Sequence, residues 1–434
     1  MSSFVFIISE MNHKRMATFF FVSLAILLSS CSEAVHANSP TENVSTKPVS
    51  LYQGTDLHFL SPSLTDHGFF YQNLIKNADG KASYYGPEVV DAFLSDVKKD
   101  KPDVLVLSGD LTFNGEKQSH IDLVDKLTAL QKDGIQPLVI PGNHDIANSD
   151  AAKFTGDTYE LVSSVTKEEF RKLYWSFGPE KAFSVDEDSF SYVYHLRKDL
   201  WLLFLDADSN GTNKISDETF EWAKEALKEA KKNNAQVISV SHETLLAQNP
   251  LFSSRYNVNR SADLAPIYED NGVFLNLSGH MHIQHQATEK TLTDATLSSL
   301  LVTPNQYAQI HYDGHALTYA TKEVPVKEWA IEKGLTDQNL LDFHTYSRKF
   351  FHDSDAANVN FMLANDYYST SDHDAMVETF CTLNANYFGG IPTDLAPLEQ
   401  GINLWLASEY RYRNYIQKIT QDCSTDYRHF SLSR

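Results

Sequence analysis

Short runs of apolar and β-branched residues recur between residues 50 and 325, and each run is bounded by polar or glycine-containing segments. Runs of this length between turn residues are typical of strands that are buried in a sheet. The runs are Leu51–Tyr52, Val104–Leu107, Pro137–Ile140, Trp201–Leu205, Val237–Val240 and Val273–Leu277. This pattern restricts the stretch to a fold built around buried β-sheet.

Helical patterns lie between several of these runs. Pro87–Lys99 has proline in its first turn, and Glu116–Lys132 spaces its Ile, Leu and Val residues by three and four. Asp217–Lys232 begins with acidic residues and ends with lysines, as the helix dipole favours. Because strands and helices alternate, the sequence predicts an α/β layered fold for residues 50–325.

Five polar motifs follow predicted strands, each at the carboxyl end of its strand. They are Asp56-Leu57-His58, Gly109-Asp110, Gly142-Asn143-His144-Asp145, Ser241-His242-Glu243 and Gly279-His280-Met281-His282. Taken singly each motif is weak: Asp-x-His occurs by chance in many proteins, whereas Gly-Asn-His-Asp and Gly-His-Met-His are moderately specific. Ligands of open α/β sheets gather at the carboxyl edge, however, so the five together predict one site.

These residue types suit a binuclear metal centre. Two divalent metals about 3.5–4 Å apart need a bridging carboxylate, while imidazoles and an amide oxygen complete their coordination. Asp110, which is alone on its turn, is the natural bridge. Such a pair acidifies a water molecule and grips phosphoryl oxygens. The ligand types fit iron, manganese or zinc equally well.

The charge of the chain excludes one class of substrate. Lys and Arg number 36 and Asp and Glu number 57, which gives a formal net charge of −21. We therefore expect no binding of nucleic-acid polymers, which depends on Lys and Arg displacing counterions. A small phosphoester would instead be attracted locally by the metal ions.

The five motifs resemble those of the calcineurin-like metallophosphoesterases over roughly residues 50–325. The resemblance implies a four-layer α/β/β/α sandwich with the metals at the sheet edge. It implies one metal held by Asp56, His58, Asp110 and His282, and a second held by Asp110, Asn143, His242 and His280. It also implies that His144 contacts the phosphate and protonates the leaving alkoxide, with Asp145 orienting its ring.

One position departs from the family pattern. Many members have aspartate three residues after the bridging residue, where this chain has Phe113. That aspartate lies behind the metal ligands, so the departure leaves metal binding intact and puts the tuning of the bridging water in question.

The stretch GDLTFNGEKQSH is similar to one in bacterial class III cyclic nucleotide phosphodiesterases. It implies hydrolysis of phosphodiesters such as 3′,5′-cyclic nucleotides, by attack of hydroxide held at the binuclear centre. Two alternatives stay open: a broad phosphomonoesterase or nucleotidase, and a non-catalytic surface lipoprotein that binds a ligand through its C-terminal region. Because every ligand position is filled, the last alternative is disfavoured.

The first residues have the pattern of a bacterial lipoprotein signal peptide. The basic residues Lys14 and Arg15 precede the apolar run Met16–Leu28, which is short for a membrane span. The run ends in a lipobox-like segment at Cys31. We expect residues 1–30 to be cleaved, Cys31 to be lipidated, and residues 31–49 to form a flexible tether. The protein would then be anchored by lipid on the extracytoplasmic face of the cell membrane; the alternative is a buried cysteine beside a short anchor.

Residues 326–434 differ in composition from the preceding part of the chain. Many aromatic residues are spread among polar ones without strand alternation, and Leu335–Phe351 and Asn403–Thr420 fit amphipathic helices. We expect a mostly helical C-terminal domain whose aromatics form a core or, alternatively, part of a lid over the site. An exported location would permit a disulfide between Cys381 and Cys423.

Several other polar residues are weaker candidates. Glu116 and His120 share a helical face that we expect to be solvated, with substrate contact as the alternative. Arg255 and Arg260 could meet a phosphate or pair at the surface. Asp206 and Asp208 end a strand near the same edge, where a role in shaping the site is the alternative to a structural one, and His285, which follows the last motif, is expected to be structural.

Overall fold

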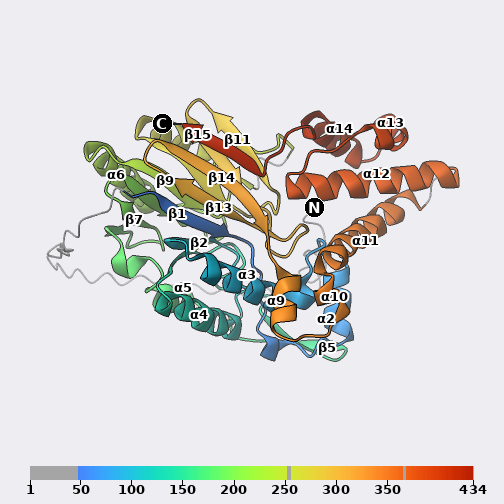
Figure 1. The fold of residues 1–434 in the computed structure, drawn as a ribbon, viewed down its shortest axis with the longest axis horizontal. Coiled ribbons are helices and arrows are strands. Elements are labelled where there is room, and N and C mark those ends of the chain that lie inside the picture. The colour runs from blue at the N-terminus through green and yellow to red at the C-terminus, as the bar shows by residue number, and fades with distance from the viewer. Residues whose placement is uncertain (1–46, 252–255, 365–367, 434) are drawn as a thin grey trace, which may run out of the picture. The chain divides into compact units, whose positions relative to one another are not determined.

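Two mixed β-sheets form the centre of the protein, shown by a computed structural model that describes residues 47–251, 256–364 and 368–433 (Figure 1). The first sheet has the strand order β15-β14-β13-β1-β2-β3 and the second β11-β12-β10-β9-β8-β7-β6. Their bounds are β1 (Val49–Gly54), β2 (Val104–Ser108), β3 (Gln136–Ile140), β6 (Ser184–Val185), β7 (Tyr192–Arg197), β8 (Leu200–Leu205), β9 (Gln236–Ser241), β10 (Val273–Ser278), β11 (His285–Glu289), β12 (Leu292–Thr296), β13 (Gln306–Tyr312), β14 (Ala316–Glu323) and β15 (His429–Ser433). A separate hairpin consists of β4 (Ala152–Thr155) and β5 (Thr158–Leu161).

Helices cover the outer face of each sheet. They are α3 (Gly86–Asp100), α4 (Lys117–Lys132), α5 (Lys167–Tyr174), α6 (Asp217–Lys232) and α8 (Ser261–Asp270), whereas α2 (Phe69–Lys76) packs against β4 of the separate hairpin. Short 3-10 helices are η1 (Pro62–Leu64), η2 (Ser83–Tyr85), η3 (Pro179–Lys181) and η4 (Ala396–Leu398). In Figure 1, α3 and α4 lie below the first sheet, and α6 lies at the left of the view near β9 of the second sheet, which it contacts.

Alternate side chains of β8 show how the layers pack. Leu202 and Phe204 join the largest core, which also contains residues of the first sheet, α3 and α4. Leu203 and Leu205 point to the opposite face and pack in a second core with α6 and α8. Because side chains alternate across a strand, β8 is buried on both faces, and its run is continuously apolar. The predicted α/β/β/α arrangement is confirmed.

Strand directions bring the strand ends together. β1, β2 and β3 run parallel to one another, so their carboxyl ends lie at one edge of the first sheet. β8, β9 and β10 are likewise parallel in the second sheet. The loops that leave these ends carry the motifs identified in the sequence.

The C-terminal region is helical over most of its length. Its helices are α9 (Val326–Glu332), α10 (Gln338–Leu341), α11 (Phe343–Leu363), α12 (Thr370–Gly389), α13 (Glu399–Ala407) and α14 (Tyr412–Asp422). Trp329 and Phe343 pack in the main core, whereas Phe380, Trp405 and Ile416 belong to a separate core formed by α11–α14. The chain then returns to the first sheet, where β15 pairs antiparallel with β14.

Two details of the C-terminal region differ from expectation. The stretch predicted as one helix over Asn403–Thr420 is divided between α13 and α14, and that over Leu335–Phe351 is divided between α10 and α11. The thiols of Cys381 and Cys423 are both free, each facing a nearby backbone carbonyl, so the disulfide is not formed. Periodicity locates helical segments, but the turns between them depend on packing.

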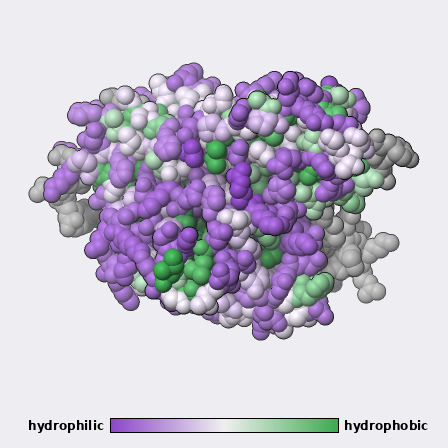
Figure 2. Space-filling view, turned by 45° about the vertical axis from the view of Figure 1, so that its right-hand side comes forward, coloured by the Kyte–Doolittle hydropathy of each residue, from purple (hydrophilic) through white to green (hydrophobic). Residues whose placement is uncertain are grey.

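Among the described residues no helix has the length and apolar character needed to span a membrane. The face in Figure 2 is mainly hydrophilic, with apolar side chains in separate patches. The signal peptide, Cys31 and most of the tether lie outside the described residues, as does Arg255.

Candidate metal centre

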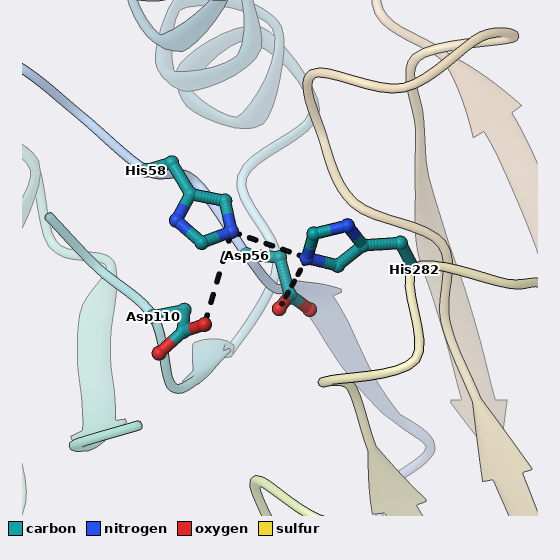
Figure 3. Close-up of side chains that lie close together, drawn as sticks. All are labelled: Asp56, His58, Asp110 and His282. Atoms are coloured by element: carbon teal, nitrogen blue, oxygen red, sulfur yellow. Dashed lines mark hydrogen bonds and ion pairs between the residues drawn. The ribbon is translucent and has the colours of Figure 1, made fainter. Parts of the chain in front are cut away.

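Five loops from both sheets carry the candidate ligands. Asp56 and His58 follow β1, Asp110 follows β2, Asn143 follows β3, His242 follows β9, and the His280–His282 loop follows β10. Figure 3 shows Asp56, His58, Asp110 and His282 turned toward one another. Residues more than 200 positions apart in the chain therefore meet where parallel strands end.

Asp110 lies between two groups of potential ligands. Its Oδ2 is 3.8 Å from His58 Nε2, and its Oδ1 is 3.4 Å from His242 Nε2. Asp110 thus belongs both to the group with Asp56, His58 and His282 and to the group with His242 and His280. A carboxylate that offers one oxygen to each side has the geometry of a bridge between two metals.

The first group is closely packed. His58 Nε2 and His282 Nε2 are 3.1 Å apart, and His282 Nε2 is 3.2 Å from Asp56 Oδ1. Asp56 Oδ2 accepts hydrogen bonds from Thr55 Oγ1 and from the His280 backbone N–H, which hold the carboxylate in place. The other oxygen, Oδ1, accepts no hydrogen bond within the described chain and faces the group.

The second group is oriented by the backbone of the first sheet. His242 Nδ1 donates to the Ser108 carbonyl at 2.9 Å, so that Nε2 faces Asp110. The His242 and His280 rings lie 5.0 Å apart. Asn143 Oδ1 is buried without a hydrogen-bond partner among the described residues. His242 Nε2 is likewise buried without a hydrogen-bond partner among the described residues. An amide oxygen and an imidazole nitrogen of this kind are donors that a metal ion accepts.

The backbone at these positions is unusual. Five ligand candidates have left-handed φ values, namely Asp56 (50°), His58 (39°), Asp110 (48°), His280 (65°) and His282 (57°). Non-glycine residues rarely adopt this region, and such strain is concentrated at functional sites. At Gly142 a Cβ atom would lie only 2.4 Å from Asp110 Oδ1, so glycine is required there.

The charges within the two groups are strongly coupled. Burial raises the pKa of Asp110, but the neighbouring His242 and His144 outweigh it and hold the pKa well below its usual value. Burial lowers the pKa of His242, but Asp110 outweighs it and raises the pKa well above its usual value. The carboxylate therefore attracts a positive charge, which a metal ion would supply in place of the proton.

His144 borders the metal groups but is oriented by residues other than those expected. Its Nδ1 donates to the Phe113 carbonyl at 2.9 Å and to Asn114 Oδ1 at 2.8 Å. Its Nε2 lies 4.0 Å from Asp110 Oδ2, and the side chain is 28% exposed. His144 therefore borders the two groups and is partly accessible to solvent.

The expected role of Asp145 in orienting His144 is wrong. Its carboxylate accepts hydrogen bonds from the backbone N–H groups of Leu111, Thr112 and Gly142 and from Thr112 Oγ1. Burial and the charge of Asp110 raise its pKa to about 7. Asp145 therefore joins the Asp110 loop to the Asn143 loop, and Asn114 performs the orienting role.

Glu116 and His120 are buried rather than on a solvated helix face. Both are completely shielded from solvent. His120 Nε2 donates to the Asp145 carbonyl at 2.9 Å, and Tyr174 donates to Nδ1 at 2.8 Å. Glu116 Oε2 accepts from the Asn114 backbone N–H at 3.1 Å. The two residues support the loops that carry Asp145 and Asn114.

The other candidates lie outside both metal groups. Arg260 pairs with Asp217 and stacks over Phe220 at the surface. Asp206 accepts from backbone N–H groups, and Asp208 is buried close to Glu243. His285 is bonded to Gln248 and to Asp422 of α14, so it connects the sheet to the C-terminal helices.

Three residues near the site were missed in the sequence. Asn114 lies in the quoted GDLTFNGE stretch, but nothing in its spacing distinguishes it. Asp79 and Lys81 belong to a turn between α2 and α3, and Asp79 Oδ2 lies 3.6 Å from His282 Nδ1. Only the polar sequence Asp-Gly-Lys marks this turn, which follows a helix rather than a strand.

Comparison with known protein families gives two matches. Residues 53–284 match the model of the calcineurin-like phosphoesterases. Residues 325–426 match the model of the C-terminal domain of cyclic nucleotide phosphodiesterase. Among curated proteins none matches the sequence.

Solved structures with a similar fold have little sequence in common with the chain. A dimetal phosphatase from Danio rerio is 11% identical, with a TM-score of 0.47 over 63% of this chain and 96% of that chain. GAP50, described as the anchor in the inner membrane complex of Plasmodium, is 13% identical, with a TM-score of 0.39 over 69% and 95%. Phosphopantetheinyl hydrolase from Mycobacterium tuberculosis is 12% identical, with a TM-score of 0.29 over 58% and 89%.

Proposed function

The chain belongs to the calcineurin-like phosphoesterases, and we propose that it is a phosphodiesterase that hydrolyses small phosphodiesters, with 3′,5′-cyclic nucleotides as the first candidates. The observation that carries the proposal is the pair of ligand groups that share Asp110. The match of residues 325–426 to the C-terminal domain of cyclic nucleotide phosphodiesterase supports the choice of substrate.

The residues present fit two metal ions. One would be held by Asp56, His58, Asp110 and His282, and the other by Asp110, Asn143, His242 and His280. Asn143 joins the second set because its amide oxygen is buried and without a partner in the described chain. When bound, such a pair polarises phosphoryl oxygens and lowers the pKa of a water molecule.

The side chains around the metals would position and protonate the substrate. His144 is partly exposed, and its Nδ1 proton is held by two acceptors, so Nε2 is the atom available to the substrate. When protonated, Nε2 would donate to a phosphoryl oxygen and then to the leaving alkoxide. General acid catalysis of this kind contributes about 10²–10⁴-fold.

The proposed site of action is the cell envelope. The lipobox-like segment at Cys31 supports lipid anchoring on the extracytoplasmic face of the membrane, with the acidic catalytic part tethered by residues 31–49. A formal charge of −21 favours a small phosphoester over a nucleic-acid polymer as substrate.

A substrate panel tests the proposal directly. The full chain, purified in detergent and reconstituted with Mn²⁺, Zn²⁺ or Fe²⁺, would be assayed on bis(p-nitrophenyl) phosphate, p-nitrophenyl phosphate and cyclic nucleotides. We expect higher kcat/KM for the diesters. Hydrolysis of monoesters alone would replace the proposal by a phosphomonoesterase or nucleotidase, and inactivity on all of them would favour a binding protein.

A further inference from the structure

The turn that connects α2 to α3 carries two charged side chains to the metal site. Asp79 Oδ2 lies 3.6 Å from His282 Nδ1 and 3.2 Å from Lys81 Nζ. The Lys81 side chain is only 12% exposed. The Lys81 ammonium group is therefore shielded from solvent, and the Asp79 carboxylate lies between it and His282, a predicted metal ligand.

The charge of Lys81 is felt by two other residues of the site. Burial lowers the pKa of His58 well below its usual value, and the charge of Lys81 lowers it further. The pKa of His144 is lowered by burial, raised by Asp110 and again lowered by Lys81. The rings of His58 and His144 lie 4.9 Å apart, so the same ammonium acts electrostatically on two neighbouring imidazoles.

The C-terminal helices hold this turn in place. Gly80 is buried with a φ of 79°, and a Cβ atom there would lie 2.6 Å from Phe351 of α11. Ser354 Oγ, one turn further along α11, donates to the Ala78 carbonyl at 3.1 Å. Helix α11 therefore touches the turn on both sides of Asp79, so the position of Lys81 depends on a region outside the metal-binding core.

We propose that residues 79–81 form a substrate-positioning turn, in which Lys81 binds an anionic phosphoryl oxygen of the substrate and Asp79 holds the His282 ring. An ammonium group binds phosphate as a point charge, which would add to the attraction by the metal ions. A carboxylate on the second nitrogen of a metal-ligating histidine fixes the ring orientation. The inference rests on the proposed function, because it assigns part of that site.

Replacing the charge tests the role of Lys81. The metal-loaded full chain would be compared as wild type, Lys81→Met, Lys81→Arg and the control Lys76→Met, which removes an exposed lysine of α2. Loss of one charge-assisted hydrogen bond corresponds to about 10- to 100-fold weaker binding. We expect Lys81→Met to weaken inorganic phosphate binding and raise KM by this factor, with metal content unchanged and kcat less affected. Lys81→Arg should retain most binding, and Lys76→Met should match wild type.

A pair of glycine substitutions tests the contribution of α11. Gly80→Ala adds a Cβ against Phe351, whereas Gly134→Ala, at a φ of 90°, meets nothing within 4 Å. Both substitutions carry the same kind of backbone strain, but only that at Gly80 lies in the turn and adds a steric contact with α11. We expect Gly80→Ala to weaken phosphate binding about 10-fold and Gly134→Ala to leave it unchanged. Equal effects would overturn the role of α11.

The outcomes separate the two proposals. Unchanged phosphate affinity and KM in Lys81→Met would overturn the positioning role, while wild-type hydrolysis of diesters would keep the proposed function. If the wild type hydrolyses no ester but its phosphate binding depends on Lys81, the positioning role of residues 79–81 would be supported and the proposed function overturned. A metal-loaded wild type that binds no phosphate would overturn both.

Discussion

Asp110 lies between the two ligand groups of the candidate metal centre, because each carboxylate oxygen faces a different group of imidazoles. Asp110→Asn keeps the size of the side chain but removes its charge. Since loss of a residue behind a metal ligand already costs 10- to 100-fold, we expect loss of the bridge to lower turnover by more than about 100-fold. Metal analysis should find at least one ion fewer per chain than in wild type.

A surface carboxylate provides the control for this change. Asp133 caps the end of α4 and pairs with Lys98, so Asp133→Asn should leave metal content and turnover unchanged. Circular dichroism would check that both variants are folded. Two ions per chain and normal activity in Asp110→Asn would contradict the assignment of the bridge.

His144 is expected to act on the leaving group rather than on the metals. His144→Ala should keep both ions and bind phosphate somewhat more weakly. Because a good leaving group needs little protonation, the variant should lose much more rate on a cyclic nucleotide than on bis(p-nitrophenyl) phosphate. The difference should lie within about 10²–10⁴-fold. Equal losses on both substrates would reduce His144 to an electrostatic role, and loss of an ion would make it a ligand.

At the scale of elements, helices α11 and α12 are joined by a buried carboxyl group. Asp355 of α11 accepts a hydrogen bond from Asn384 Nδ2 of α12 at 2.8 Å, and burial raises its pKa to about 7. In the unfolded chain this group loses its proton near pH 4. The folded chain holds the proton up to about pH 7, so the free energy of unfolding falls as pH rises from about 4 to about 7.

Asp355→Asn should remove this pH dependence while keeping the acceptor for Asn384. We expect the variant to be more stable than wild type at pH 8, by at most about 4 kcal/mol for a shift of roughly three units, and to differ little at pH 4. Thermal unfolding in the presence of chelator at both pH values would measure it. The control is Asn360→Ala, an exposed residue of the same helix that carries no titratable group, so its effect on stability should be the same at both pH values. Equal changes at both pH values would contradict the ionisation argument.

At the scale of the whole molecule, the metal centre joins the two sheets. Asp56, His58 and Asp110 leave strands of the first sheet, whereas His242 and His282 leave strands of the second. Ions bound between them would stabilise the folded state by about 2.7 kcal/mol at 100 times Kd for each site. Tm should therefore rise with metal concentration and fall on chelation by roughly 5 °C or more. An identical Tm with and without chelator would argue against metals bridging the sheets.

The location of the whole molecule depends on its first residues. If Cys31 is lipidated, Cys31→Ser should move the protein from the membrane fraction to the soluble fraction, because the single anchoring residue is lost. Fractionation followed by immunoblotting would show this. Cys423→Ser serves as the control, since that thiol is free and lies in the C-terminal region. Unchanged membrane association of Cys31→Ser would indicate another mode of attachment.

The sequence by itself determined the α/β architecture and the residues that meet at the strand ends. Both are visible in short stretches of sequence, since a buried strand is an apolar run and the turn after it is marked by polar residues or glycine. His58 and Asp110 could be placed together because the parallel strands that they follow share one edge of a sheet. Helix boundaries within 403–420 were missed because periodicity does not report where packing ends a helix.

Only the tertiary structure decided which polar groups support the site. Glu116 and His120 have the spacing of a solvated helix face, but loops that are distant in the chain cover them. Asp145 is adjacent to His144 in sequence, yet its carboxylate bonds to another loop. The strand β15 and the turn bearing Lys81 acquire their places through contacts with partners more than 100 residues away. Long-range contacts of this kind produce no periodic pattern in the sequence. They form between surfaces that meet only when the chain has folded, so they cannot be predicted from neighbouring residues.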